Sequence, residues 1–218
     1  MLKLSFDSGK PNSLSNILLL GAHSDDIEIG CGGTILKLAR ENPDSCIDWV
    51  VFSAKGQRIE EAKASANAFL STVKHKRVVI KEFRDGFFPY SGGEIKDFFE
   101  QMKLEISPDL IFTHYRDDLH QDHRLISELT WNTFRNHLIL EYEIPKYDGD
   151  FGSPNLFIHL DPVTCQEKIG YLLDHFKTQE NKDWFTGETF SSILRLRGIE
   201  SKAPEQYAEA FYCRKITI

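Results

Sequence analysis

The sequence has few of the features that direct a chain to a membrane, to nucleic acid or out of the cell. No apolar run approaches the roughly 18 to 20 residues that a helix needs to cross a bilayer. Residues 1–7 do not have the charged-then-apolar layout of a signal peptide. Basic residues are in the minority, 26 against 33 acidic ones for a net charge of −7, so the overall field repels polyanions. We therefore expect no membrane span, no secretion signal and no nucleic-acid partner.

Cysteine, proline and glycine are also scarce. The 4 cysteines lie far apart and include no C-x-x-C pair, which argues against a disulfide framework and favours the reducing cytoplasm. With 8 prolines and 14 glycines, the chain has no Pro-, Gly- or Ser-rich linker that would divide it. The sequence therefore predicts a single domain over residues 1–218.

What the chain does have is an alternation of short apolar runs and amphipathic stretches, with 41% hydrophobic residues to bury in a core. Expected strands are 17–20, 46–52, 78–83, 110–113 and 138–142. Expected helices are 34–42, 58–73, one that follows Gly92 or Gly93 and runs to about 103, and 122–135. This alternation predicts an α/β fold, a Rossmann-like doubly wound sheet that is mostly parallel with helices on both faces. After Pro145 the pattern predicts an irregular C-terminal elaboration, with extended segments at 155–159 and 207–213 and helices at 165–177 and 185–196.

Histidine and aspartate gather where two of the predicted strands end. The segment 22–34 follows the first strand and carries one imidazole and three carboxylates within six residues, and the segment 114–124 follows the fourth strand. Ligands of open α/β sheets bind beyond the carboxyl ends of the strands. Carboxylates crowded there resist ionisation, and a bound cation removes that cost. His23, Asp26 and His123 form the three-ligand set that a catalytic zinc takes, with a fourth position open to water.

These residues resemble a known family. The motif AHSDD at 22–26, followed by a glutamate and a glycine run, and the motif HQDH at 120–123 are similar to the signatures of the LmbE/PIG-L family of zinc-dependent N-acetyl-sugar deacetylases. The similarity extends to RIEE at 58–61, DG at 85–86 and YAEAF at 207–211, and so covers most of the chain. The resemblance implies the same three metal ligands.

The resemblance also implies roles for the neighbouring residues. Asp25 would be the general base, and His120 would face the developing oxyanion with Asp122 as its orienting partner. Two positions depart from the family pattern. Ser24 stands where proline is common, and Ile27 follows the aspartate pair where a glutamate is frequent, which leaves the role of the next residue, a glutamate, open.

The positions suggest a mechanism. A zinc ion held by three ligands lowers the pKa of its water towards about 7, and Asp25 is free to accept the proton as the water attacks an amide carbonyl. A protonated His120, paired with Asp122, would supply the positive charge that stabilises the tetrahedral oxyanion. Either Asp25 in its acid form or His120 then protonates the departing amine.

Other polar residues near the two clusters have weaker claims. Arg58 begins a helix that should face the ligand-binding edge, where it contacts substrate hydroxyls or phosphate or else forms a surface ion pair. Asp85 and Arg116 are further candidates for the substrate. Cys31 is expected to be a small buried residue and His114 a structural or exposed one, and neither is expected to be a ligand. The glycines around Cys31 do not complete a G-x-G-x-x-G dinucleotide motif, so close packing is their expected role.

The leading hypothesis is a hydrolase with one zinc per chain that removes acetyl from an N-acetylated sugar, free or carried on a nucleotide. Two alternatives stay open: another metal-dependent hydrolase such as a phosphoesterase, and a sugar-nucleotide binding module with a degenerate site. The presence of every proposed catalytic group counts against the binding module. The expected partner is this small-molecule substrate, with a homo-oligomer as an open alternative.

Overall fold

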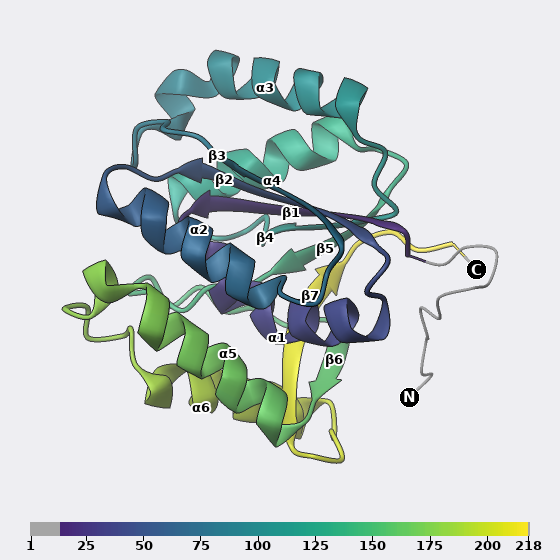
Figure 1. The fold of residues 1–218 in the computed structure, drawn as a ribbon, viewed down its shortest axis with the longest axis vertical. Coiled ribbons are helices and arrows are strands. Elements are labelled where there is room, and N and C mark those ends of the chain that lie inside the picture. The colour runs from purple at the N-terminus through teal and green to yellow at the C-terminus, as the bar shows by residue number, and fades with distance from the viewer. Residues whose placement is uncertain (1–13, 218) are drawn as a thin grey trace.

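The computed structural model describes residues 14–217, and the segment 1–7 discussed above lies outside them. The described residues form a seven-stranded sheet in the order β3-β2-β1-β4-β5-β7-β6, with helices on both faces (Figure 1). The first five strands in that order pair in parallel, and β7 pairs antiparallel with both β5 and β6. The predicted α/β fold with a mostly parallel, doubly wound sheet is confirmed.

The strands are β1 (Asn16–His23), β2 (Cys46–Ser53), β3 (His75–Ile80), β4 (Leu110–His114), β5 (Leu138–Tyr142), β6 (Leu156–Leu160) and β7 (Tyr207–Cys213). The α-helices are α1 (Asp26–Glu41), α2 (Gln57–Phe69), α3 (Gly92–Glu105), α4 (Gln121–Thr133), α5 (Pro162–His175) and α6 (Gly187–Glu200). Two short 3-10 helices, η1 (Phe88–Ser91) and η2 (Lys177–Gln179), lie in the connections.

The central strand β1 explains the two-sided core. Ile17 and Leu19 pack into the cluster that includes α1, α2 and α5, while Leu18 and Leu20 pack into the cluster that includes α3 and α4. Consecutive side chains of a strand point to opposite faces, so a strand covered on both sides must be apolar at every position. In Figure 1, α3 and α4 lie on one side of the sheet and α1, α2 and α5 on the other.

The strand order places a reversal of connection beside the first histidine cluster. β1 pairs with β2 on one side and with β4 on the other, so the order of connection reverses between β1 and β4. In doubly wound sheets ligands bind at such a reversal, outside the carboxyl ends of the strands. β1 ends at His23 and β4 ends at His114, so both predicted clusters follow strands that flank this point.

The first helix differs most from expectation. It begins at Asp26 rather than Thr34, and the glycines lie inside it, around a break at Cys31 with φ −142° and ψ 16°. A Cβ at Gly30 would overlap the ring of Tyr142. Glycine disfavours helix, but here the packing contacts that only glycine permits override that propensity. The expectation that these glycines serve close packing is confirmed.

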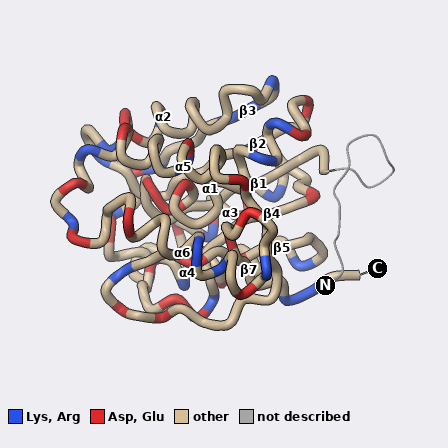
Figure 2. The backbone as a smooth tube through the Cα atoms, turned by 90° about the horizontal axis from the view of Figure 1, so that it is seen from below, with Lys and Arg blue, Asp and Glu red and all other residues tan. Residues whose placement is uncertain are grey.

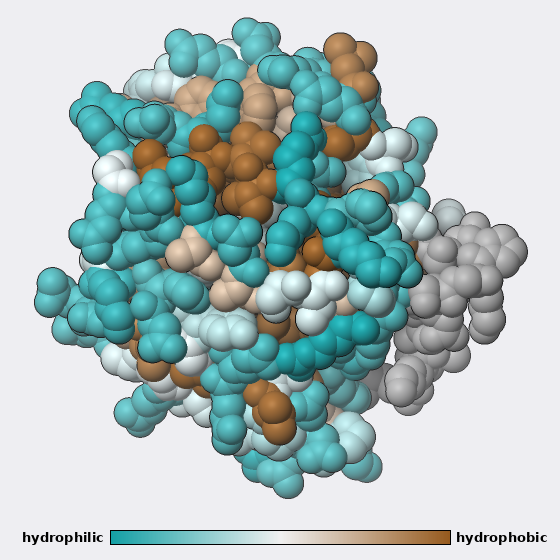
Figure 3. All heavy atoms as spheres, viewed as in Figure 1, coloured by the Kyte–Doolittle hydropathy of each residue, from teal (hydrophilic) through white to brown (hydrophobic). Residues whose placement is uncertain are grey.

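The C-terminal part is more regular than the sequence indicated. β6 and β7 extend the sheet, α5 packs on α1 and α2, and α6 packs on β7. Acidic and basic residues are interspersed along the backbone (Figure 2). The face in Figure 3 is largely hydrophilic, with apolar residues gathered between α3 and α2. Within residues 14–217, no helix has both the length and the apolar character needed for a membrane crossing.

Candidate metal centre and active site

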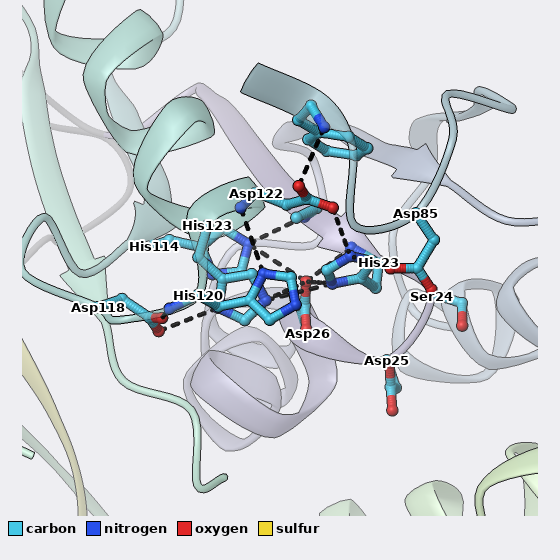
Figure 4. Close-up of polar contacts among 12 residues, drawn as sticks. His23, Ser24, Asp25, Asp26, Asp85, His114, Asp118, His120, Asp122 and His123 are labelled. Atoms are coloured by element: carbon cyan, nitrogen blue, oxygen red, sulfur yellow. Dashed lines mark hydrogen bonds and ion pairs between the residues drawn. The ribbon is translucent and has the colours of Figure 1, made fainter. Parts of the chain in front are cut away.

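Three side-chain atoms from different parts of the chain converge at the carboxyl edge of β1 and β4. The Nδ1 of His23 lies 3.2 Å from the Nε2 of His123. The Oδ2 of Asp26 lies 3.4 Å from the first of these nitrogens and 3.5 Å from the second. All three residues are buried. The three predicted metal ligands are therefore brought together, as Figure 4 shows.

The spacing of these three atoms suits a single small cation. Ligand atoms held at about 2.0 to 2.1 Å from a tetrahedral zinc are about 3.4 Å from one another. The three separations of 3.2, 3.4 and 3.5 Å match that edge length. The residues present therefore fit a divalent metal with nitrogen and carboxylate ligands.

The second nitrogen of His123 is held by a carboxylate that the sequence analysis did not single out. His123 Nδ1 lies 3.0 Å from the Oδ2 of Asp118, which is buried and also receives Lys146 Nζ at 2.8 Å. A donor bond from Nδ1–H to a carboxylate leaves the Nε2 lone pair free for a metal. Burial, reinforced by the nearby His114, lowers the pKa of His123 to about 4, so the ring is neutral near pH 7.

His23 has the mirror arrangement. Its Nε2 lies 3.2 Å from Asp122 Oδ2 and 3.1 Å from Asp85 Oδ1, so its Nδ1 faces the metal position. Asp122 is fixed in turn by the backbone N–H groups of Gly86 and Phe88, at 2.7 and 3.1 Å. Burial alone lowers the pKa of His23, but the surrounding carboxylates outweigh it and raise that pKa well above its usual value. A metal at this position competes with a proton.

Asp26 is placed by the start of α1. It lies in the first turn, and its Oδ2 accepts a 2.6 Å hydrogen bond from the backbone N–H of His23. Burial by itself raises the pKa of Asp26, but His123, His114 and His23 around it hold that pKa well below its usual range. The carboxylate is therefore ionised, as a metal ligand must be.

Asp25 points away from the cluster (Figure 4). Its Oδ1 lies 3.6 Å from Arg58 Nη2. Arg58 also donates to Ser24 Oγ at 3.0 Å and contacts Asp85 Oδ2 at 3.4 Å. Burial, with Asp26 adding to it, raises the pKa of Asp25. The predicted base Asp25 and the two predicted substrate contacts, Arg58 and Asp85, are thus neighbours.

His120 lies beside the three ligand atoms but not in the expected state. Its ring stacks on His123 at 4.5 Å and meets His23 edge-on at 4.9 Å. Its Nδ1 accepts a 3.2 Å hydrogen bond from the backbone N–H of Asp122, which an imidazolium cannot do. Burial also lowers the pKa of His120. The expected protonated ring paired with the Asp122 carboxylate is wrong for this structure, because that carboxylate is bonded to His23 instead.

Three other polar residues that the sequence drew attention to are not among the three ligand atoms. Arg116 is exposed, and the hydrogen bond that it makes within residues 14–217 is a backbone N–H donated to Glu141, so the structure does not bring its side chain to the site. His114 is fully buried, and its Nε2 accepts from the Ala22 N–H at 2.9 Å while lying 3.2 Å from Asp26 Oδ2. Glu28 is fully buried and accepts from Ser65 Oγ at 2.6 Å with one carboxylate oxygen, while the other has no hydrogen-bond partner within residues 14–217.

The histidine and aspartate atoms can be grouped in more than one way. Besides His23, Asp26 and His123, three further groups of the described residues have donor atoms within 4.8 Å of one another: His23, His120 and His123; Asp26, His114 and His123; and His23, Asp85 and Asp122. The groups overlap, so they describe one polar cluster. Asp118, the residue that sequence reasoning missed, lies in the segment 114–124, but nothing in the pattern separates it from its neighbour Asp117.

The chain matches the family model described as "PIG-L: GlcNAc-PI de-N-acetylase" over residues 18–134. Its fold is similar to that of N,N'-diacetylchitobiose deacetylase from Pyrococcus horikoshii, with a TM-score of 0.72, 20% identity, and 92% of this chain and 84% of the other covered. It is also similar to GalB, the 4-carboxy-2-hydroxymuconate hydratase from Pseudomonas putida KT2440, with a TM-score of 0.71, 16% identity, and 94% and 98% covered.

A third similar structure is the zinc-inhibited form of teicoplanin deacetylase Orf2, with a TM-score of 0.71, 14% identity, and 91% of this chain and 97% of the other covered. At these identities the three structures show a shared fold. The family model spans more than half of the chain and includes both histidine and aspartate clusters. The chain therefore belongs to the PIG-L family.

Proposed function

We propose that this protein is a metal-dependent N-deacetylase that removes acetyl from an N-acetylated sugar or sugar conjugate, with one zinc ion per chain. The observation that carries the proposal is the convergence of His23 Nδ1, Asp26 Oδ2 and His123 Nε2 within 3.5 Å of one another. Family membership supports the reaction, because the matching model is described as a de-N-acetylase. Two of the similar structures are named as deacetylases, one of N,N'-diacetylchitobiose and one of teicoplanin.

His23, Asp26 and His123 would hold the metal. When bound, zinc supplies Lewis-acid chemistry: it lowers the pKa of water and polarises the carbonyl that is attacked. The carboxylates of Asp122 and Asp118 hold the two imidazole rings so that one nitrogen of each faces the metal position. This support fixes the tautomer of each ring and raises its basicity as a ligand.

Asp25 would act as the general base. It follows the ligand-bearing strand directly, is buried, and lies 3.6 Å from Arg58 Nη2. Its carboxylate points away from the three ligand atoms in this structure, so it must turn towards them to take a proton from the attacking water. Its raised pKa brings the carboxylate closer to the pH at which proton transfer is efficient. The same group, once protonated, can return the proton to the departing amine.

His120 would stabilise the oxyanion as a neutral donor. Because Nδ1 accepts the Asp122 N–H, the neutral ring carries its proton on Nε2, where it can donate to a developing negative charge. This differs from the imidazolium that the sequence suggested, but keeps the residue and its function.

Arg58 and Asp85 would contact the substrate. They lie at 3.4 Å from each other on the solvent side of the cluster, with the Asp85 side chain 55% exposed. A guanidinium beside a carboxylate offers both donors and acceptors to the hydroxyls of a sugar ring. The hydrogen bond with His23 lowers the pKa of Asp85 to about 2, so it is an acceptor at neutral pH. Arg116 remains a candidate only for an extended substrate.

Purified protein incubated with N-acetylhexosamines and their nucleotide conjugates tests the proposal. We expect acetate and free amine to appear in equal amounts, and to disappear when a chelator removes the metal. Phosphate release without acetate would instead support a phosphoesterase. Binding of sugar nucleotides without turnover by the metal-loaded protein would support the binding-module alternative.

We also propose that the protein works in the cytoplasm. The cysteines of the described residues are all free, as expected in a reducing compartment. A homo-oligomer remains open to direct measurement in solution.

A further inference from the structure

The break in α1 is occupied by two charged side chains from distant parts of the chain. In an unbroken helix the N–H of Gly33 would donate to the carbonyl of Ile29, four residues earlier. Here the Gly33 N–H donates to Glu209 Oε1 at 2.8 Å, and the Ile29 carbonyl accepts from Lys168 Nζ at 2.6 Å. Lys168 and Glu209 contact each other at 2.6 Å. The ion pair is therefore inserted into a helical hydrogen bond.

Glu209, on β7, acts as an N-terminal cap for the second part of α1. Its two carboxylate oxygens accept from two successive backbone N–H groups, those of Gly33 and Thr34, at 2.8 and 2.6 Å. The first N–H groups of a helical segment have no partner within the helix and attract negative charge. The carboxylate satisfies them from outside the helix, across 175 positions of sequence.

Lys168, on α5, is the matching partner for the first part of α1. Carbonyls at the end of a helical segment lack N–H partners and attract positive charge. The ammonium of Lys168 meets the carbonyl of Ile29 there. Both side chains are almost completely buried, at 3% and 2% exposed. Such burial is costly unless the charges are paired and hydrogen-bonded, as these are.

The glycines allow this insertion. A Cβ at Gly33 would overlap Leu160 and lie 3.1 Å from Glu209 Oε1, and a Cβ at Gly32 would overlap the ring of Phe69. An inserted side chain is a recognised cause of a helix kink. The conformation of the break is therefore fixed by packing from β7 and α5.

The segment before the break carries the metal centre. It spans residues 26–30, begins with the ligand Asp26, and follows Asp25 and His23 directly. Because it is so short, its direction depends on how its two ends are held: β1 holds the first, and the break holds the second. A change of direction at Ile29 moves Asp26 relative to His123, which is anchored on α4.

We infer that Lys168 and Glu209 are positioning residues for the metal centre, acting through the break in α1 to hold Asp26 against the two histidines. The inference rests on the proposed function in assuming that His23, Asp26 and His123 bind a metal. Neither side chain is proposed to touch metal or substrate.

A second buried ion pair provides a matched control. Arg197 donates to both oxygens of Glu143, at 2.6 and 2.7 Å, and Glu143 is only 7% exposed. This pair joins α6 to the end of β5 and lines the same small cavity as Ile29. Within residues 14–217 its hydrogen bonds go to residues outside α1. Loss of a buried charge in either pair should lower stability, but only the Lys168–Glu209 pair is hydrogen-bonded to α1 on both sides of the break.

The experiment titrates Zn²⁺ into the metal-free full chain in competition with a chromophoric chelator, and records the visible spectrum with Co²⁺. We expect Glu209→Gln to raise the apparent Kd for Zn²⁺ at least tenfold and to alter the Co²⁺ spectrum. The apparent Kd of Glu143→Gln for Zn²⁺ should stay within twofold of that of the original chain, even if its Tm falls as far as that of Glu209→Gln. Hydrogen exchange of the peptide over 26–34 should quicken in Glu209→Gln alone.

Glu209→Asp is the second variant, because it keeps the charge beside Lys168 and withdraws the oxygens by one methylene. If Glu209→Gln shows no cooperative unfolding, and so is not folded, Glu209→Asp tests the inference in its place. We expect Glu209→Asp to raise the apparent Kd for Zn²⁺ at least threefold. Zn²⁺ affinity within twofold of the original in both variants would overturn the inference, as would equal weakening by Glu143→Gln. Absence of Zn²⁺ and Co²⁺ binding by the unaltered chain would instead overturn the proposed function, and with it the metal centre assumed here.

Discussion

The Nδ1 of His23 and the Nε2 of His123 face each other at 3.2 Å, although 100 positions separate the two residues. Each ring is held from behind by a carboxylate, Asp122 for the first and Asp118 for the second. Neither ring can turn without losing that hydrogen bond. The two ring nitrogens are therefore directed to one point, which Asp26 completes.

Removal of either histidine should abolish tight metal binding at this position. We expect His23→Ala and His123→Ala each to lower Zn²⁺ affinity by at least 100-fold, because a three-ligand site is left with two. Metal content after dialysis, measured by elemental analysis, checks this against one zinc per chain for the unaltered protein. His75→Ala, at the exposed start of β3, is the control. Full affinity in either variant would remove that residue from the ligand set.

The adjacent aspartates should separate into two roles. Asp25→Asn preserves shape and removes the proton acceptor, so we expect kcat to fall by roughly 10² to 10⁴ with metal content intact. Asp26→Asn should weaken metal binding instead, because its carboxylate oxygen lies among the ligand atoms. Metal content and kcat are measured side by side. A metal-free Asp25→Asn, or a fully active one, would contradict the base assignment.

His120 should affect rate without affecting metal content. If it donates to the oxyanion, His120→Ala should reduce kcat by about 10²-fold or more, the scale of losing one such donor. His120→Asn retains an N–H donor and should recover part of the loss. A ring nitrogen of His120 lies within 4.8 Å of ring nitrogens of His23 and His123. Loss of metal in His120→Ala would therefore make His120 a ligand.

Asp118 should matter for metal affinity although it is not a ligand. Loss of a carboxylate behind a metal-binding histidine typically costs about 10- to 100-fold in affinity or activity. We expect Asp118→Asn to fall in this range and Asp117→Asn, its exposed neighbour, to have little effect. The same Zn²⁺ competition assay measures both. Equal affinities for the two variants would show that Asp118 does not support His123.

The cap of α5 makes a pH-dependent contribution to stability. Asp161 accepts from the Thr164 N–H at 2.8 Å, and this bond lowers the pKa of Asp161. A carboxyl whose folded pKa is depressed stabilises the protein above its unfolded pKa, and that stability is lost as pH falls through the folded value. Asp161→Ala should therefore cost about 1 kcal/mol near pH 7 and progressively less below about pH 4. Thermal melts over pH, with Asp174→Ala on the same helix as control, measure this.

The sequence predicted the sheet and its ligand-binding edge because both depend on local patterns. An apolar run such as Ile17–Leu20 can be buried on two faces only as a central strand, and β5 and β7 have the bounds predicted from such runs. The chemistry of His23, Asp26 and His123 was likewise visible, because parallel strands bring their carboxyl ends to one edge. These are consequences of residue type and spacing.

Side-chain partners were decided by the tertiary structure. The sequence predicted that Asp122 pairs with His120. In the structure the packing of η1 against α4 surrounds the Asp122 carboxylate with two backbone N–H groups and His23. The sequence offered no reason to prefer Asp118 over Asp117. The sequence placed the start of the first helix at Thr34, because glycine disfavours helix. In the structure α1 begins at Asp26, and Glu209 from β7 and Lys168 from α5 bind the backbone at the break within it. Hydrogen bonds of this kind join residues up to 176 positions apart, so their formation depends on which elements pack together rather than on any local preference.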